Sequence, residues 1–534
     1  MSSVSGFERA VRAVGGFFAL RPATGTIAPN LVSIAISCVT IVSACLTFGP
    51  RLGMVSLLGA LTTYWETGRP LWARVRNGLL VTAALTGCMS AGVLVAPYRW
   101  AIVPASVLII VIVSLVYYTF TLTAGPSPVM MFYAAVLGTF FGADQRVGWQ
   151  TVGITAAAAF FTSVLLLVPL VFAPYGPEQR ALDRARRAVS AYQDQADADE
   201  DTQRISRNDA YHAINSAWLT LRSAWPAGRG RRHRVLIAEL TQVNRRLAAT
   251  ILSRLGISTA IRPTPDTLLL RDRPNWRFLL GHAVRGHSVE WFTSWRMGLA
   301  AGVAGVISQL LGTGHPYWAI LTATVVINQW MDRAAATRRA GHRTVGTLLG
   351  VGVFWLASTL QPSAWWSVVL VLACMAGMYL LLTMNYAVAL MFVTPMALLS
   401  VQASGSGETV ASLTFDRFTD TLIGAAAAVA VTWGTSWFFP RRLVRSQSIR
   451  AAAALAAAED ANRAGTQFSA EGRSARAELQ YELIHHVSIL DRAVRDDPRL
   501  VDLADAEHRL ADDGYATLGR AWQARPAPVG EHTG

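Results

Sequence analysis

The stretch from Trp330 to Gly350, WMDRAAATRRAGHRTVGTLLG, joins an arginine cluster to an apolar segment with regularly spaced glycines. Its four arginines are Arg333, Arg338, Arg339 and Arg343. The pattern fits a nucleic-acid patch, a phosphate-binding loop or the polar edge of a membrane helix. Long apolar runs lie on both sides of it, near 316–331 and 343–360, and an apolar run of about 20 residues crosses a bilayer. The stretch therefore predicts the boundary of a membrane-spanning helix.

The composition of the whole chain supports a membrane protein. Of the 534 residues, 52% are hydrophobic and 15% are charged, whereas soluble domains carry about 25% charged residues. Apolar runs fill 27–173 and 291–439, while 174–290 and 440–534 have the charged sequence typical of soluble helices. This segregation predicts an all-α polytopic membrane protein with two apolar regions, each followed by a polar helical one.

The basic residues exclude several function classes. All 47 are arginine, and the net charge is +14. A phosphate-binding loop needs its lysine, and a pyridoxal-phosphate enzyme needs a Schiff-base lysine. No nucleic-acid-binding motif and no nucleophile–base arrangement is present. His282 and His287 are five residues apart, and His485 and His486 are adjacent, so neither pair has the spacing of a helical metal site. We expect no enzyme activity, no cofactor, no metal and no nucleic-acid partner.

The two apolar regions resemble copies of one another. Leu61–Thr62 recurs at Leu321–Thr322, and Met131–Phe132 recurs at Met391–Phe392, both 260 residues apart. The shared offset predicts a duplication into two six-helix transmembrane repeats in parallel arrangement, with the pathway between them. The expected spans are 27–48, 52–66, 78–96, 100–120, 128–143, 149–172, 293–312, 316–331, 343–360, 364–382, 385–402 and 417–438. The count falls to ten or eleven if the short second, fifth or eighth span is re-entrant.

The distribution of arginines predicts the orientation. Arginine-rich segments precede the first span and follow the second, eighth and twelfth spans, which places these segments and both termini in the cytoplasm. The expected location is the plasma (inner) membrane. Residues 1–26 then form a cytoplasmic N-terminus with an amphipathic helix over 7–20. The apolar stripes of 174–290 and 440–534 predict cytoplasmic helices that pack against partner helices.

Polar side chains within the spans are candidates for a substrate pathway, because each must face protein or water. Arg343 and Thr347 lie one helical turn apart on one face, and a guanidinium binds carboxylates bidentately without losing its charge. The other pathway candidates are Trp318, Thr322, Asn385 and Thr394. The alternative is that these arginines only fix the topology, which we favour for the other three of the cluster. The glycines of the stretch then only let helices pack closely.

Two carboxylates lie at membrane boundaries, Glu66 at the end of the second span and Asp420 in the twelfth. Both are candidates for proton coupling. Asp420 also follows Arg417 by three residues, so the two could instead neutralise one another.

Three blocks of the second apolar region resemble the fusaric acid resistance and aromatic acid exporter family (FUSC-like membrane proteins). They are HPYWAILTATVVINQ…RAGHRTVGTLLG (315–350), NYAVALMFVTPMALL (385–399) and RFTDTLIGAAAA (417–428), in the family's order. The first apolar region keeps arginines in GALTTYWETGRPLWARVRNGLL (59–80) but lacks the RxxGT core. The resemblance implies two membrane repeats with cytoplasmic helical regions and proton-driven efflux of aromatic carboxylic acids.

These observations together predict an inner-membrane efflux transporter for small organic anions, with aromatic carboxylic acids as expected substrates. Two alternatives stay open at this point. One is an anion channel or facilitator, because no carboxylate lies in the middle of a span. The other is a membrane scaffold without transport that recruits partners through its cytoplasmic helices, because the first repeat is degenerate.

Overall fold

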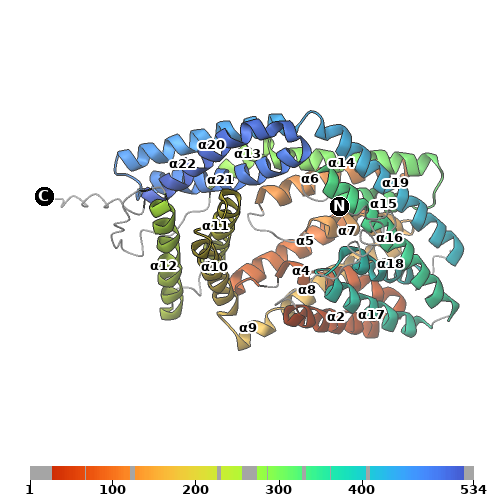
Figure 1. Cartoon of the computed structure of the whole chain (residues 1–534). Coiled ribbons are helices and arrows are strands. Elements are labelled where there is room, and N and C mark those ends of the chain that lie inside the picture. The colour runs from red at the N-terminus through yellow and green to blue at the C-terminus, as the bar shows by residue number, and fades with distance from the viewer. Residues whose placement is uncertain are drawn as a thin grey trace, which may run out of the picture.

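The computed structural model shows apolar helices beside a helical domain built from the polar segments (Figure 1). It describes residues 27–521 except 67, 121–126, 225–229, 255, 257–273, 286, 328–331, 361–362 and 404–408. Every regular element in these ranges is a helix. The amphipathic helix expected over 7–20 lies outside the described residues.

The first apolar region forms a series of helices interrupted by short turns. They are α2 (Ile27–Gly53), η1 (Met54–Ser56), α3 (Leu57–Ala60), α4 (Thr63–Glu66), α5 (Leu71–Val95), η2 (Arg99–Ala101), α6 (Ile102–Phe120), α7 (Val129–Phe141), α8 (Gln145–Leu165) and α9 (Val168–Phe172). The expected second span at 52–66 is therefore η1, α3 and α4 rather than one helix. Gly49 breaks the preceding helix with a φ of 80°, a backbone conformation that favours glycine.

In its described part, the second apolar region contains six helices. The polar segments form the remaining helices of the described structure. The six are α14 (Val289–Leu310), α15 (Pro316–Ile327), α16 (Arg333–Thr359), α17 (Ala364–Leu381), α18 (Tyr386–Ala403) and α19 (Val410–Ser436). The polar segments form α10 (Gly176–Asp194), α11 (Glu200–Ser223), α12 (Arg231–Arg254), α13 (Trp276–Val284), α20 (Pro440–Arg463), α21 (Ala470–Asp496), η5 (Pro498–Leu500) and α22 (Val501–Arg520).

Five helical segments among the described residues are long and apolar enough to cross a membrane: 29–65, 71–95, 99–120, 145–172 and 364–381. A sixth is added if α19 and α20, bent by 60°, count as one span. α7, α15 and α18 are apolar but shorter, and α14 and α16 carry arginines within their apolar stretches. The described part of the chain is all-helical and contains candidate membrane-spanning segments, and the full count of twelve stays a prediction.

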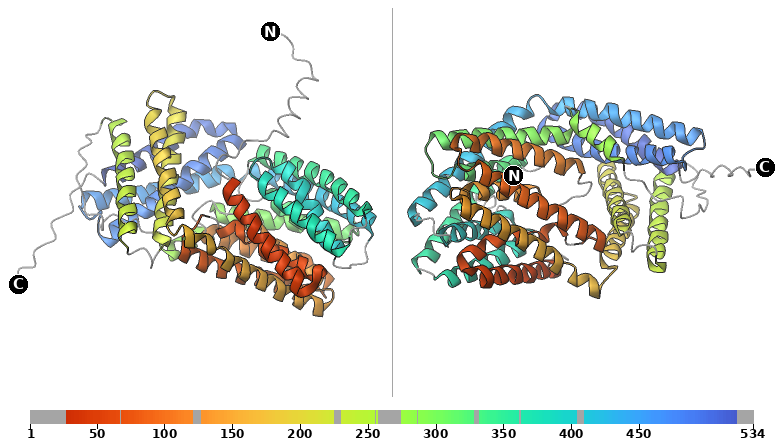
Figure 2. Two further views of the ribbon diagram at one scale, coloured as in Figure 1. Left: turned by 90° about the horizontal axis from the view of Figure 1, so that it is seen from below. Right: turned by 180° about the vertical axis from the view of Figure 1, so that it is seen from behind.

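Corresponding helices of the two apolar regions make corresponding contacts. α5 packs against α7 and α8, as α16 packs against α18 and α19. α3 packs against α8, as α15 packs against α19. Between the regions, α2 contacts α17 and α14 contacts α6, which brings the N-terminal helices beside those of the second region (Figure 2).

The helical domain has its own apolar core, which α10, α11 and α12 share with α20, α21 and α22. Tyr211 of α11 and Tyr515 of α22 stack with ring centroids 4.3 Å apart. Arg207 and Asp512 join the same two helices by an ion pair of 2.5 Å. In Figure 1, α20 to α22 continue from the end of α19 along the top of the view, and α10 to α12 stand at the left. The segments that follow the two apolar regions therefore form one domain.

Glycines set the closest crossings within the second apolar region. A Cβ atom added to Gly424 of α19 would contact the Ala319 carbonyl oxygen and lie 2.7 Å from Cβ of Thr322. A Cβ atom on Gly350 would lie 2.7 Å from Cβ of Thr394. Small residues at such positions let helices approach each other closely in lipid.

We predict that Gly424→Ala destabilises the protein, because overpacking costs about 1–3 kcal/mol. Gly434→Ala, on the same helix, is the matched control, since no atom lies within 4 Å of its added Cβ. Thermal unfolding of the purified protein in detergent should show a lower midpoint for Gly424→Ala and no loss for Gly434→Ala. Equal midpoints for the two variants would contradict the packing argument.

Candidate functional site

A central cavity of about 1130 Å³ lies between the two apolar regions. The first region contributes residues of α3, α4 and α7, and the second contributes residues of α15, α16, α18 and α19. Much of the wall is apolar, including Leu58, Leu61, Met130, Leu390 and Met396. Aromatic side chains also line it: Tyr64, Trp65, Tyr133, Phe141, Trp318 and Tyr386.

The charge of the central cavity is of one sign. Five arginines line it, and no aspartate or glutamate does so in the described part of the chain. The five are Arg69, Arg338, Arg339, Arg343 and Arg417. An apolar wall with only cationic groups favours an anion over a cation or a neutral solute.

Arg343 and Arg417 form a buried pair, with 1% exposure each. Arg343 lies three turns into α16, and its Nη2 donates to the Tyr133 hydroxyl at 3.4 Å. The Arg417 guanidinium, on α19, lies 5.2 Å from the centre of the Trp318 ring and interacts with the same hydroxyl. Nε of both arginines and Nη2 of Arg417 have no hydrogen-bond partner in the described structure. The pair therefore has N–H donors to spare.

The other arginines of the 330–350 stretch lie in two different places. Arg338 and Arg339 line the central cavity, and the Arg339 guanidinium lies 5.0 Å from the centre of the Tyr386 ring. Arg333 instead faces α21, where its backbone N–H donates to Asp496 at 2.7 Å and its Nε lies 3.7 Å from the same carboxylate oxygen. Asp332 caps α16 by accepting the Ala335 N–H. The cap and the Asp496 contact fix the start of the helix that carries the arginines.

The sequence-predicted pathway residues fall into two groups. Arg343, Trp318 and Asn385 line the central cavity, and the Asn385 side chain also accepts the N–H groups of Ala387 and Val388. Thr322, Thr347 and Thr394 are fully buried and are not part of the cavity wall. Thr322 and Thr394 instead face the glycines at the crossings described above.

Several wall residues were not predicted as pathway residues: Tyr133, Tyr386, Arg69 and Arg417. The sequence analysis considered Arg417 only as a possible charge partner of Asp420. Tyr133 follows Met131–Phe132, one of the repeated dipeptides, but that signal points to a duplication and not to a site.

Of the two proton-coupling candidates, Asp420 lies one turn from Arg417 on α19 and is not part of the cavity wall. Asp420 is fully buried, and its Oδ1 accepts from Ser308 at 2.8 Å and from Thr313 at 3.0 Å, at the end of α14. Asp416, one turn earlier, lies 4.0 Å from Nε2 of His315. The Glu66 residue ends α4, but its side chain lies outside the part that the structure describes.

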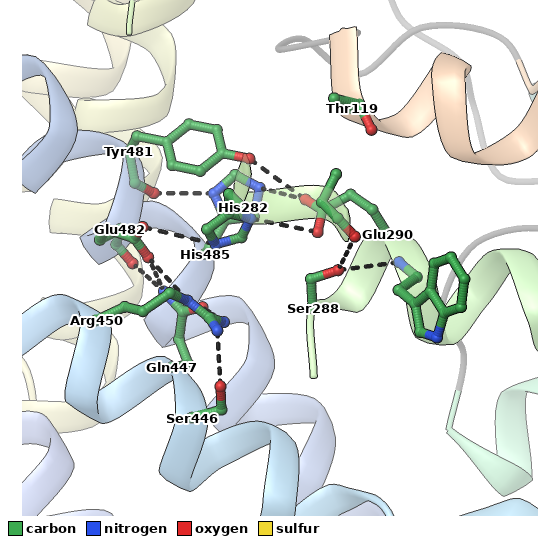
Figure 3. A network of polar contacts seen from close by, with 12 residues as sticks. Thr119, His282, Ser288, Glu290, Ser446, Gln447, Arg450, Tyr481, Glu482 and His485 are labelled. Carbon is green, nitrogen blue, oxygen red and sulfur yellow. Dashed lines mark hydrogen bonds and ion pairs between the residues drawn. The ribbon is translucent and has the colours of Figure 1, made fainter. Parts of the chain in front are cut away.

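A second polar group, the junction cluster, joins the apolar helices to the helical domain (Figure 3). His282 of α13 lies between two carboxylates, with Nδ1 3.6 Å from Glu290 of α14 and Nε2 3.6 Å from Glu482 of α21. The Tyr481 hydroxyl donates to Glu290 at 3.3 Å, and Arg450 Nε lies 3.7 Å from Glu482. The cluster fixes α21 to the start of α14.

Part of the second apolar region is similar to a known protein family. Residues 303–431 match the family model described as "Fusaric acid resistance protein-like". Inner membrane protein YccS of Escherichia coli (strain K12) is 34% identical over 163 residues, which cover 28% of this chain and 21% of that protein. The uncharacterized protein slr1298 of Synechocystis sp. (strain ATCC 27184 / PCC 6803 / Kazusa) is 30% identical over 142 residues, or 26% of this chain and 18% of that protein.

These matches span about a fifth of the length of the curated relatives. No solved structure matches the chain. The family resemblance predicted from the motifs is confirmed, and the matched residues include both Arg343 and Arg417.

We predict that the junction cluster makes the stability pH-dependent. Burial alone would lower the pKa of His282, but the nearby carboxylates of Glu290 and Glu482, each 3.6 Å from a ring nitrogen, outweigh burial and raise this pKa from 6.5 to about 9. Because the pKa is higher in the folded state, the stabilisation is complete below pH 6.5 and is lost as the pH rises through 9. The loss is on the order of 3 kcal/mol.

Thermal unfolding in detergent from pH 6 to pH 10 measures this effect. The difference between the wild type and His282→Gln should shrink over that interval, while the exposed His287→Gln control follows the wild type. A difference that stays constant or grows with pH would contradict the assignment.

Proposed function

We propose that the protein exports small organic anions, with aromatic carboxylic acids as substrates, through the central cavity. The observation that carries this proposal is the buried pair of Arg343 and Arg417 in a cavity whose described walls hold five arginines and no carboxylate. A guanidinium stays charged, and burying it is costly unless a counter-charge lies nearby. Asp420, one turn from Arg417, partly offsets this cost for Arg417, whereas no carboxylate is paired with Arg343 in the described structure. Two guanidiniums around one hydroxyl repel each other, so an anion between them stabilises both.

The shape and chemistry of the wall support an aromatic acid. A carboxylate accepts two parallel N–H bonds from a guanidinium, and the unpartnered N–H groups of the pair can donate them. The ring of the acid would pack against the aromatic faces of Trp318 and Tyr386 and the leucine and methionine side chains near them. Asn385 lies on the same wall and can donate its amide N–H to a polar ring substituent.

The pathway would run between two six-helix repeats, 27–173 and 291–439, in parallel arrangement. The corresponding helix contacts of the two regions support this repeat. We place residues 1–26, 174–290 and 440–534 with both termini in the cytoplasm and the spans in the plasma (inner) membrane. In this orientation Arg69, Arg338 and Arg339 face the cytoplasm and attract anions to the cavity. Thr322, Thr347 and Thr394 would reach the solute only when the tight helix crossings open.

Asp420 is our candidate for proton coupling. Its buried carboxylate lies on the same helix as Arg417, one turn away, so a change in its protonation would act on the position of α19. Its hydrogen bonds to Ser308 and Thr313 tie α19 to the end of α14. Glu66 is the second candidate by its place in the sequence.

We predict that Arg343→Gln and Arg417→Gln each reduce benzoate transport by about tenfold or more, since a hydrogen bond to a charged group contributes about 1.5–3 kcal/mol. Efflux of radiolabelled benzoate from proteoliposomes measures the effect. Arg442→Gln is the matched control, because Arg442 is an exposed arginine outside the cavity. Full transport by well-folded Arg343→Gln and Arg417→Gln variants would overturn the proposal, and absence of flux in the wild type would favour the scaffold alternative.

We predict that Asp420→Asn uncouples transport from a proton gradient and leaves benzoate exchange intact. The amide keeps the size of the side chain but cannot take up a proton. The measurement is benzoate accumulation against its concentration gradient with an imposed pH gradient. Accumulation by Asp420→Asn equal to that of the wild type would exclude Asp420, and no gradient-driven accumulation in the wild type would favour a channel.

A further inference from the structure

Tyr133 links the two apolar regions at the arginine pair. It lies on α7 in the first region, whereas Arg343 and Arg417 lie on α16 and α19 in the second. Arg343 Nη2 donates to its hydroxyl at 3.4 Å, and Arg417 interacts with the same oxygen. The first region therefore places a polar atom at the point where the two guanidiniums converge.

The chemistry of this contact fixes the role of the phenol oxygen. A guanidinium has only donors, so the oxygen of Tyr133 must act as the acceptor. A carboxylate that bridges the two guanidiniums would accept from Arg343 Nη2 as well as from the unpartnered N–H groups of the pair. It is charged and can bind in a bidentate manner, whereas the phenol is a neutral, single-oxygen acceptor. A carboxylate that enters the cavity therefore competes with the phenol oxygen and displaces it.

We infer that the Tyr133 hydroxyl occupies the place of the anion in the empty protein, and that the bound anion displaces it. This inference rests on the proposed function, because it concerns the same site. Displacement removes a polar link between α7 and the helices of the arginine pair. The anion would therefore bind more tightly to the state in which Tyr133 is released from the arginines than to the state in which it is bonded to them. Such a difference in affinity is the condition for a ligand to shift a conformational equilibrium.

The opposite role is that Tyr133 assists binding by donating its own O–H to the anion. The two roles predict opposite effects of removing the hydroxyl. If the Tyr133 hydroxyl competes with the anion, removing the hydroxyl strengthens anion binding. If the hydroxyl donates a hydrogen bond to the anion, removing it weakens anion binding.

Benzoate binding to the purified full chain in detergent, measured by isothermal titration calorimetry, separates the two roles. We expect Tyr133→Phe to bind benzoate about threefold to tenfold more tightly than the wild type, the range expected for the loss of one long and therefore weak hydrogen bond between Arg343 and the Tyr133 oxygen. Tyr98→Phe is the control, because Tyr98 is an exposed tyrosine outside the cavity wall, and it should keep the wild-type affinity. Tyr133→Leu should change the affinity in the same direction as Tyr133→Phe.

Weaker or unchanged binding by Tyr133→Phe would overturn the inference. If the wild type binds benzoate and Arg343→Gln does not, weaker or unchanged binding by Tyr133→Phe refutes only the role of Tyr133 and leaves the proposed function standing. If the wild type binds no benzoate, or if Arg343→Gln and Arg417→Gln keep full affinity, the proposed function itself fails.

Discussion

The guanidinium groups of Arg343 and Arg417 converge on one phenol oxygen, buried among apolar helices and without a carboxylate on the described cavity wall. This arrangement is unfavourable in an empty apolar bundle, because each charge loses its water and the two repel one another. The helices that hold it must therefore be stabilised by other contacts. Under the proposed function, an anion that enters the cavity would offset both costs.

Two kinds of contact hold the pair in place. Close crossings at Gly346, Gly350 and Gly424 lock α16 to α18 and α19 to α15. The helical domain adds a second constraint, since α21 contacts the start of α16 through Asp496 and the start of α14 through the junction cluster. A single helix of that domain thus contacts two helices of the second apolar region.

Much of this organisation could be predicted from the sequence, because lipid imposes simple rules. Long apolar runs predicted the helical membrane regions, and the position of Arg343 beside its span predicted a wall residue of the cavity. Tyr133 and Tyr386 could not be predicted in the same way, since their roles depend on which helices face each other across the two regions. The sequence marked the second span as short and possibly re-entrant but did not locate its breaks. Its apolar run continues through η1, α3 and α4, and only the backbone at Gly49 and the turns that follow show the breaks.

The central claim is that the buried arginine pair holds an organic anion, and a structure with bound 4-bromobenzoate tests it most directly. The anomalous signal of bromine locates the ring, and the electron density locates the carboxylate. We predict a carboxylate within hydrogen-bonding distance of Arg343 and Arg417, with the bromine in the central cavity against its aromatic and aliphatic wall. Occupied bromobenzoate sites found only outside this cavity, or a cavity that stays empty at saturating ligand, would contradict the account.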